Sequence, residues 1–84
     1  MEKSIYSKEY SLFLEQLRNA REASGLTQTD VAKSLSQTQS FVSKVERGER
    51  RIDVVELRAF CKALGLSFQD FALKVEAVLA IETK

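Results

Sequence analysis

Apolar side chains recur along the chain at the spacing of amphipathic helices, and capping residues divide this pattern into five helical segments. The chain has no Pro and no alternating stretch long enough for a β-sheet. The first segment should run from about Lys8 to Ser24, with Gly25 ending it. Its buried stripe should comprise Tyr10, Phe13, Leu14, Leu17 and Ala20. The pattern therefore predicts a single all-α domain over residues 1–84.

Two short helices follow, joined by a turn of about three residues. The pair Thr27 and Asp30 has the spacing of a capping box, which starts the first of these helices. Thr38 is a good N-cap for the second, expected from Gln39 to Arg47. Two helices joined in this way form the geometry that places the second helix in the major groove of DNA. We therefore expect a helix-turn-helix core at about residues 27–47.

The last two helices should begin at Asp53 and Ser67, and the fifth should cover about residues 68–81. Nine of the 11 residues from Phe71 to Ile81 are apolar, more than the single stripe that a surface helix of a monomer needs. Either this helix is wedged into its own core, or its second side packs on another chain. We favour the second interpretation, with a homodimer interface formed by Phe71, Val75, Val78 and Leu79.

The composition argues against several classes of function. The single Cys and the absence of His exclude an internal disulfide, the usual zinc sites and His-dependent catalysis. Cys61 lies in an apolar pattern and is expected to be a small buried hydrophobe. We predict no metal, no cofactor and no small-molecule ligand, and an enzyme is the least favoured class. No signal peptide or membrane-spanning stretch is evident, so the expected location is the cytoplasm, at the nucleoid.

Charge alone does not indicate a nucleic-acid partner, because the net charge is only +1. Its distribution is slightly uneven: residues 27–51 have five basic and three acidic side chains, which gives +2. Residues 1–26 sum to zero and residues 52–84 to −1. The weak positive bias thus lies in the segment where a DNA-binding surface would need it.

The segment from Gly25 to Gly48, GLTQTDVAKSLSQTQSFVSKVERG, carries an ordered set of motifs. They are Gly25-Leu26-Thr27-Gln28, Asp30, Ala32, Thr38-Gln39-Ser40, Val42-Ser43 and Glu46-Arg47-Gly48. In order and spacing they resemble the Cro/phage-repressor helix-turn-helix family, often called Xre-like, and the resemblance covers about Leu17 to Phe71. It implies a five-helix lambda-repressor-like DNA-binding domain.

The turn between the two short helices departs from the family pattern. The family usually has Gly there, followed by a small apolar residue, whereas this chain has Ser36 and Gln37. If the turn needs a positive φ at Ser36, the backbone carries strain of about 1 kcal/mol.

The outer face of the predicted recognition helix is polar, and we expect its base-contacting residues to be Gln39, Ser40, Ser43 and Lys44. A Gln amide can bond both N6 and N7 of adenine, and a Lys can reach O6 and N7 of guanine. The alternative for all four is a solvated polar face. Phe41, between this row and the core, is expected to pack against the protein rather than touch a thymine methyl.

The expected contacts to the DNA backbone are Gln28, Thr38, Arg47, Arg50 and Arg18, with Arg51 as a further candidate. The resemblance assigns Gln28 to a phosphate at the N-terminus of its helix. The arginines suit phosphates by charge, although a run of solvated charges would look the same. The resemblance also implies a structural ion pair between Arg21 and Glu46.

These observations favour a sequence-specific regulator of transcription that binds double-stranded DNA as a homodimer on a near-palindromic operator. The alternative is a protein-protein interaction module on the same fold, which the near-neutral charge supports. Free-standing family members of this size include restriction-modification controllers, phage switches and antitoxins, and the sequence does not separate them.

Overall fold

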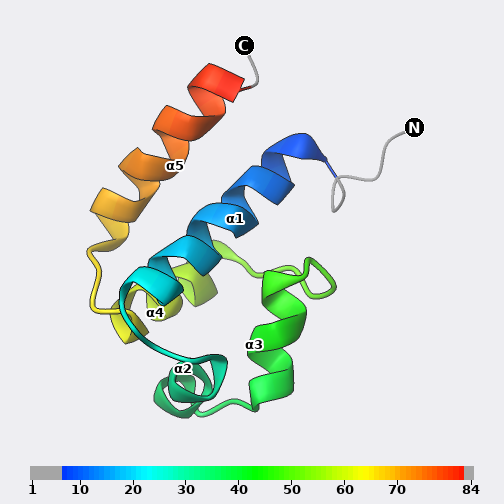
Figure 1. Ribbon diagram of the computed structural model, residues 1–84, viewed down its shortest axis with the longest axis vertical. Helices are drawn as coiled ribbons and strands as arrows, with labels where there is room; N and C mark the ends of the chain where they lie inside the picture. The colour runs from blue at the N-terminus through cyan, green and yellow to red at the C-terminus, as the bar shows by residue number, and fades with distance from the viewer. Residues whose placement is uncertain (1–6, 83–84) are drawn as a thin grey trace.

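The computed structural model describes residues 7–82, and this part of the chain is all-α, as predicted (Figure 1). Residues 1–6 and 83–84 of the predicted domain lie outside the described range. The helices are α1 (Lys8–Ala23), α2 (Gln28–Leu35), α3 (Gln39–Glu46), α4 (Val54–Ala63) and α5 (Phe68–Glu82). These bounds agree with the predicted ones to within about one residue, because side-chain caps determine where most of the helices begin.

Capping boxes start α2 and α4. Thr27 Oγ1 accepts a hydrogen bond from the Asp30 N–H at 3.0 Å, and the Asp30 carboxylate accepts one from the Thr27 N–H at 2.9 Å. These bonds to Thr27 lower the pKa of Asp30. Asp53 and Glu56 repeat the arrangement at 2.7 and 2.9 Å. Each pair satisfies two backbone N–H groups that would otherwise lack partners at a helix start.

The core lies where α1 to α4 converge, and α5 covers it along one side. The most deeply buried side chains are Leu17, Val31, Val42, Val45 and Cys61. The burial of Cys61 agrees with its predicted role as a small hydrophobe, and burial raises the pKa of its thiol. The α5 helix runs antiparallel beside α1 (Figure 1).

The turn between α2 and α3 requires a left-handed backbone. Ser36 caps the C-terminus of α2 with φ 57° and ψ 40°, and the next N–H, of Gln37, donates to the Ala32 carbonyl at 2.9 Å. Ser36 is the one non-glycine residue with a positive φ between residues 7 and 82. The condition for the predicted strain, a positive φ at Ser36, is therefore met at the position where the family usually has Gly.

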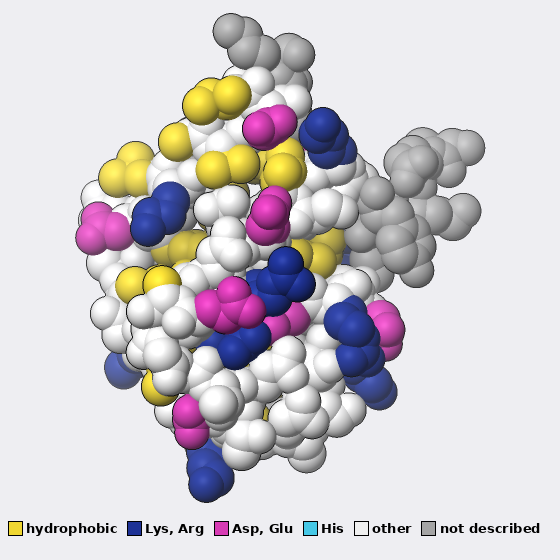
Figure 2. All heavy atoms as spheres, viewed as in Figure 1, with side chains coloured by type: hydrophobic (Ala, Val, Ile, Leu, Met, Phe, Trp, Pro, Cys, Tyr) yellow, Lys and Arg dark blue, Asp and Glu magenta, His cyan; other side chains and the backbone are white. Residues whose placement is uncertain are grey.

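The α5 helix has an inner and an outer apolar side. Phe71, predicted at a dimer interface, is instead a core residue of its own chain: it is 3% exposed and its ring packs edge-on against Phe13, with centroids 6.3 Å apart. Val75 is half-buried and packs against the same core. On the outer side Leu73 and Ile81 are 65% and 72% exposed. Figure 2 shows hydrophobic side chains gathered over α5, whereas charged ones gather toward the middle of this view.

Candidate nucleic-acid interface

The predicted base-contacting row lies on an uncovered side of α3, which forms one edge of the molecule (Figure 1). Val42 and Val45 turn the opposite side of this helix into the core, where both are fully buried. The row itself remains accessible, because Gln39, Ser40 and Lys44 are exposed and Ser43 is half-buried. The fold therefore presents these four side chains together, at the spacing of one helix face.

A largely buried ion pair connects α3 to α1. Arg21 Nε donates to Glu46 Oε2 at 2.6 Å and Arg21 Nη2 to Glu46 Oε1 at 3.1 Å, while Arg21 Nη1 donates to the Leu26 carbonyl at 2.9 Å. The two side chains are only 13% and 4% exposed. The hydrogen bond to Glu46 is the main reason that the pKa of Arg21 is raised. The ion pair that the family resemblance implied is thus present, in a fork geometry that fixes both partners.

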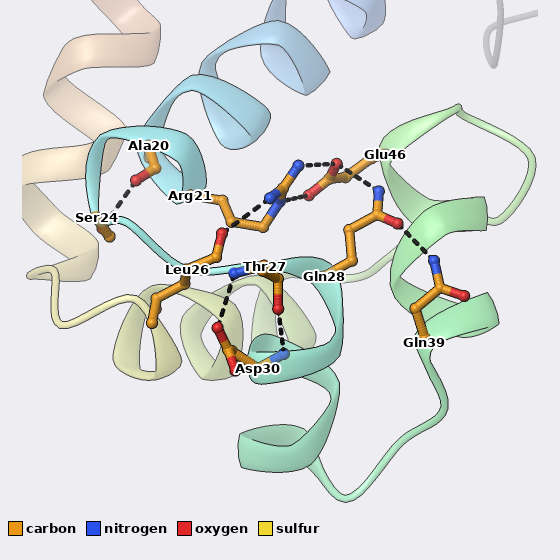
Figure 3. A network of polar contacts seen from close by, with 9 residues as sticks. All are labelled: Ala20, Arg21, Ser24, Leu26, Thr27, Gln28, Asp30, Gln39 and Glu46. Carbon is orange, nitrogen blue, oxygen red and sulfur yellow. Dashed lines mark hydrogen bonds and ion pairs between the residues drawn. The ribbon is translucent and has the colours of Figure 1, made fainter.

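A chain of hydrogen bonds extends this ion pair to the recognition row (Figure 3). Gln28 Nε2 donates to Glu46 Oε1 at 3.0 Å, and Gln28 Oε1 accepts from Gln39 Nε2 at 2.6 Å. The amide of Gln28 therefore lies between the carboxylate of Glu46 and the amide of Gln39. Sequence reasoning assigned Gln28 to a phosphate and Gln39 to a base, and it missed both of these contacts.

The remaining hydrogen-bonding groups of the two amides still fit DNA. A Gln side chain has two N–H donors and one oxygen acceptor. Gln28 uses one N–H on Glu46, so its second N–H remains for a phosphate. Gln39 uses one N–H on Gln28 and retains the other together with its oxygen. An N–H and an oxygen on one amide are the pair that bonds N7 and N6 of adenine.

The arginines at the end of α3 are already bonded to carboxylates. Arg47 Nε and Nη2 donate to the two oxygens of Glu49 at 3.0 and 3.1 Å, and its Nη1 donates to Ser43 Oγ. Arg50 Nη1 and Nη2 donate to Glu56, both at 3.0 Å. In each pair the hydrogen bonds raise the pKa of the arginine and lower that of the glutamate. The sequence predicted phosphate contacts at Arg47 and Arg50 but did not predict these two ion pairs.

Phe41 packs inward, as expected. Its ring stacks on Phe60, with centroids 6.3 Å apart, and the Arg50 guanidinium lies 5.0 Å above the Phe41 ring. The Arg51 guanidinium lies 4.2 Å from the ring centroid of Tyr10, a contact that the sequence pattern did not predict. Both arginines of the loop after α3 thus lie over aromatic rings.

Arg18 and Thr38, the two other side chains predicted to contact the DNA backbone, lie at separate places around this face. Arg18 is exposed and lines a surface hollow between α1 and the end of α3 together with Arg47. Thr38 Oγ1 accepts the Phe41 N–H at 3.1 Å, so its hydroxyl hydrogen is the part left for a phosphate.

Residues 7–82 contain no group of three or more His, Cys, Asp or Glu side chains that could hold a metal ion. None of the five helices has the length and apolar character that crossing a membrane requires.

Comparison with known proteins gives a family and a set of similar folds. The family described as a helix-turn-helix domain matches residues 12–72. An XRE-family like protein from Pseudomonas syringae pv. tomato is 43% identical, with a TM-score of 0.79, over 83% of this chain and 85% of that one. A search of curated proteins finds no significant match.

Two restriction-modification controller proteins share the fold. A point mutant of C.Esp1396I has a TM-score of 0.81 at 23% identity, over 93% of this chain and 98% of that one. C.AhdI from Aeromonas hydrophila has a TM-score of 0.66 at 29% identity, over 79% and 99%. The similarity at 23% identity shows the fold alone.

Proposed function

Because this chain belongs to the Xre-like helix-turn-helix family of DNA-binding regulators, we propose that it binds specific sites in double-stranded DNA as a homodimer and thereby regulates transcription. In this proposal α3 enters the major groove. Gln39, Ser40, Ser43 and Lys44 contact base edges, while Gln28, Thr38, Arg18, Arg47 and Arg50 contact phosphates.

The observation that carries the proposal is the hydrogen bond between Gln28 and Gln39. It links the first residue of α2, whose N-terminus favours an anion, to the first residue of α3, which faces the groove. The bond leaves Gln39 with the donor and acceptor that adenine requires, already oriented before DNA arrives. Preorganisation of this kind lowers the entropy cost of binding.

The homodimer rests on the outer side of α5. Leu73 and Ile81 are exposed there, and Ala77 lies between them at the same four-residue spacing. Half-buried Val78 and Leu79 border this stripe. A second copy would cover these side chains and give the two-fold symmetry that places two α3 helices about 34 Å apart on a near-palindromic operator.

A protein-interaction module remains the second candidate, and a specific observation favours it. Both arginines at the end of α3 are neutralised by carboxylates, so this surface attracts DNA less than its arginine content suggests. The polar row on α3 and its link to Gln28 favour DNA instead. As a DNA-binding regulator, the protein is proposed to act in the cytoplasm, at the nucleoid.

The test is selection of bound sequences from a random duplex library with purified protein at about 100 mM salt. We expect a near-palindromic motif with half-sites about one helical turn apart. The double variant Gln39→Ala/Lys44→Ala is the matched control and should lose the enriched motif while keeping its circular dichroism spectrum. If the folded wild-type protein enriches no sequence, specific DNA binding is wrong, and a search for protein partners becomes the next step.

A further inference from the structure

The charge of the DNA-facing arginines is balanced within the protein. Glu49 takes up two of the five N–H donors of Arg47, and the Arg47–Glu49 pair is half-exposed, with 53% and 54% of the side chains accessible. Arg50 is also held by two hydrogen bonds to one carboxylate, from its Nη1 and Nη2 to Glu56, and it donates to the Arg51 carbonyl as well. An approaching phosphate would therefore meet a carboxylate on each guanidinium.

From this arrangement we propose that Glu49 and Glu56 compete with DNA phosphates for Arg47 and Arg50, which keeps the affinity for DNA of any sequence below what the arginines alone would give. The inference rests on the proposed function, because it concerns the same DNA-binding face.

The physical reason is that a carboxylate and a phosphate are alternative partners for the same planar donor fork. Forming a bidentate bond from Arg47 to a phosphate requires that its bond to Glu49 be rearranged or broken. A neutral ion pair also displaces fewer counterions from DNA than a free arginine does, so the salt dependence of binding should be shallow. Since exposed ion pairs are weak, the competition should change affinity by a modest factor.

A double-mutant cycle tests the competition for Arg47 directly. Wild type, Glu49→Gln, Arg47→Ala and the double variant are titrated against a fluorescent mixed-sequence duplex of about two helical turns, by anisotropy, over roughly 50–200 mM salt. Glu22→Gln, which removes one exposed negative charge from α1, measures the long-range effect of charge.

We expect Glu49→Gln to tighten binding about two- to fivefold more than Glu22→Gln does, and to make the salt dependence steeper. In the Arg47→Ala background the same substitution should have no effect beyond that of Glu22→Gln, because the group for which Glu49 competes is gone.

Four outcomes would overturn the inference. Weaker binding by Glu49→Gln would make Glu49 a positioning residue for Arg47. If Glu49→Gln and Glu22→Gln change the affinity equally, Glu49 acts only by general repulsion of the DNA charge. The same conclusion follows if the effect of Glu49→Gln persists in the Arg47→Ala background. If the wild-type protein is folded and binds no duplex even at low salt, the proposed function fails, and this inference fails with it.

The Arg50–Glu56 pair gives an independent repeat of the cycle with Glu56→Gln and Arg50→Ala. The Gln substitution keeps an amide oxygen that can accept the Asp53 N–H, so the cap of α4 is preserved. Tighter binding by Glu56→Gln that disappears in the Arg50→Ala background supports the inference, and unchanged binding would remove Glu56 from it.

Discussion

Gln28 Oε1 accepts a hydrogen bond from Gln39 Nε2 at 2.6 Å, so the first residue of α2 orients the first residue of α3. Glu46 holds the other end of the Gln28 amide at 3.0 Å and is itself paired with Arg21. The Gln39 side chain, which we propose reads a base, is thereby connected through Gln28 to the Arg21–Glu46 ion pair at the C-terminal end of α3.

The first prediction concerns this Gln pair. Gln39→Ala should weaken binding to the selected operator by about 1–3 kcal/mol and leave a scrambled duplex unaffected, because a base contact carries sequence information. Gln28→Ala should weaken binding to both duplexes, since it removes a phosphate donor as well as the support for Gln39. Anisotropy titrations measure both effects, with Gln69→Ala on α5 as the control. If Gln39→Ala binds every duplex as wild type does, the recognition row is misassigned.

The second prediction concerns the buried ion pair. Glu46→Ala should lower the free energy of unfolding by about 3 kcal/mol, because the Arg21 guanidinium, 13% exposed, would be left without its carboxylate. Urea unfolding followed by circular dichroism measures the change. Glu22→Ala, at an exposed position on α1, should stay within about 0.5 kcal/mol of wild type. Equal stability of the two variants would show that the pair does not stabilise the fold.

The third prediction uses the strained turn. Ser36→Gly should raise the free energy of unfolding by about 0.5–1 kcal/mol, because Gly adopts φ 57° without the steric penalty that a Cβ imposes. The matched control is Ser34→Gly, an exposed position inside α2, which should lower it by about the same amount. Thermal or urea unfolding distinguishes them by sign. If Ser36→Gly instead lowers the free energy of unfolding, the left-handed backbone at Ser36 is not a source of strain.

The fourth prediction concerns self-association. The double variant Leu73→Asp/Ile81→Asp should be monomeric by sedimentation and retain its helical spectrum, because both side chains point away from the core. Val55→Asp is the control: Val55 is equally exposed, at 73%, but lies on α4. It should leave the dimer intact. A double variant that remains dimeric would place the interface elsewhere, and a monomeric Val55→Asp would point to α4.

The fifth prediction is a pH dependence. Hydrogen bonds lower the pKa of Asp30, Glu49 and Glu56 in the folded protein. A lowered pKa gives stability that is fully present above the unfolded value, 3.8 for Asp and 4.5 for Glu, and is lost as the pH falls through the folded value. The urea midpoint should therefore hold down to about pH 5 and then fall.

Glu56→Gln provides the control for the pH dependence, because it removes one of the three titrating groups. Its urea midpoint should fall less steeply on acidification than that of wild type. An equally steep fall would show that other carboxylates determine the acid response.

The fold was predictable because its signals are local. Caps such as Thr27 with Asp30 are read from spacing alone, and the apolar stripes identify which side of each helix is buried. The Arg21–Glu46 pair, 25 residues apart, became predictable only through the family resemblance. Phe71 was misplaced because an apolar helix face does not reveal whether its cover is its own chain or another.

The partners of the arginines were less predictable. Glu49 lies two residues from Arg47, across Gly48, and Glu56 lies six residues from Arg50, across a loop. Neither separation follows a helical period, so helical pairing rules do not find these contacts. They depend on the path of the loop, in which Gly48 has φ 80° and an added Cβ would come within 3.1 Å of Leu14 Cδ1.

The position of Glu46 has a consequence for how this protein can evolve. A substitution of Glu46 would disturb both the packing of the recognition helix and the orientation of Gln28. Changes at this position would therefore affect folding and operator preference together. Ser40 and Lys44 lie on the exposed side of α3, so substitutions there do not disturb the packing of the core. New binding specificities should therefore arise first at these two positions, in lineages whose Arg21, Gln28 and Glu46 stay unchanged.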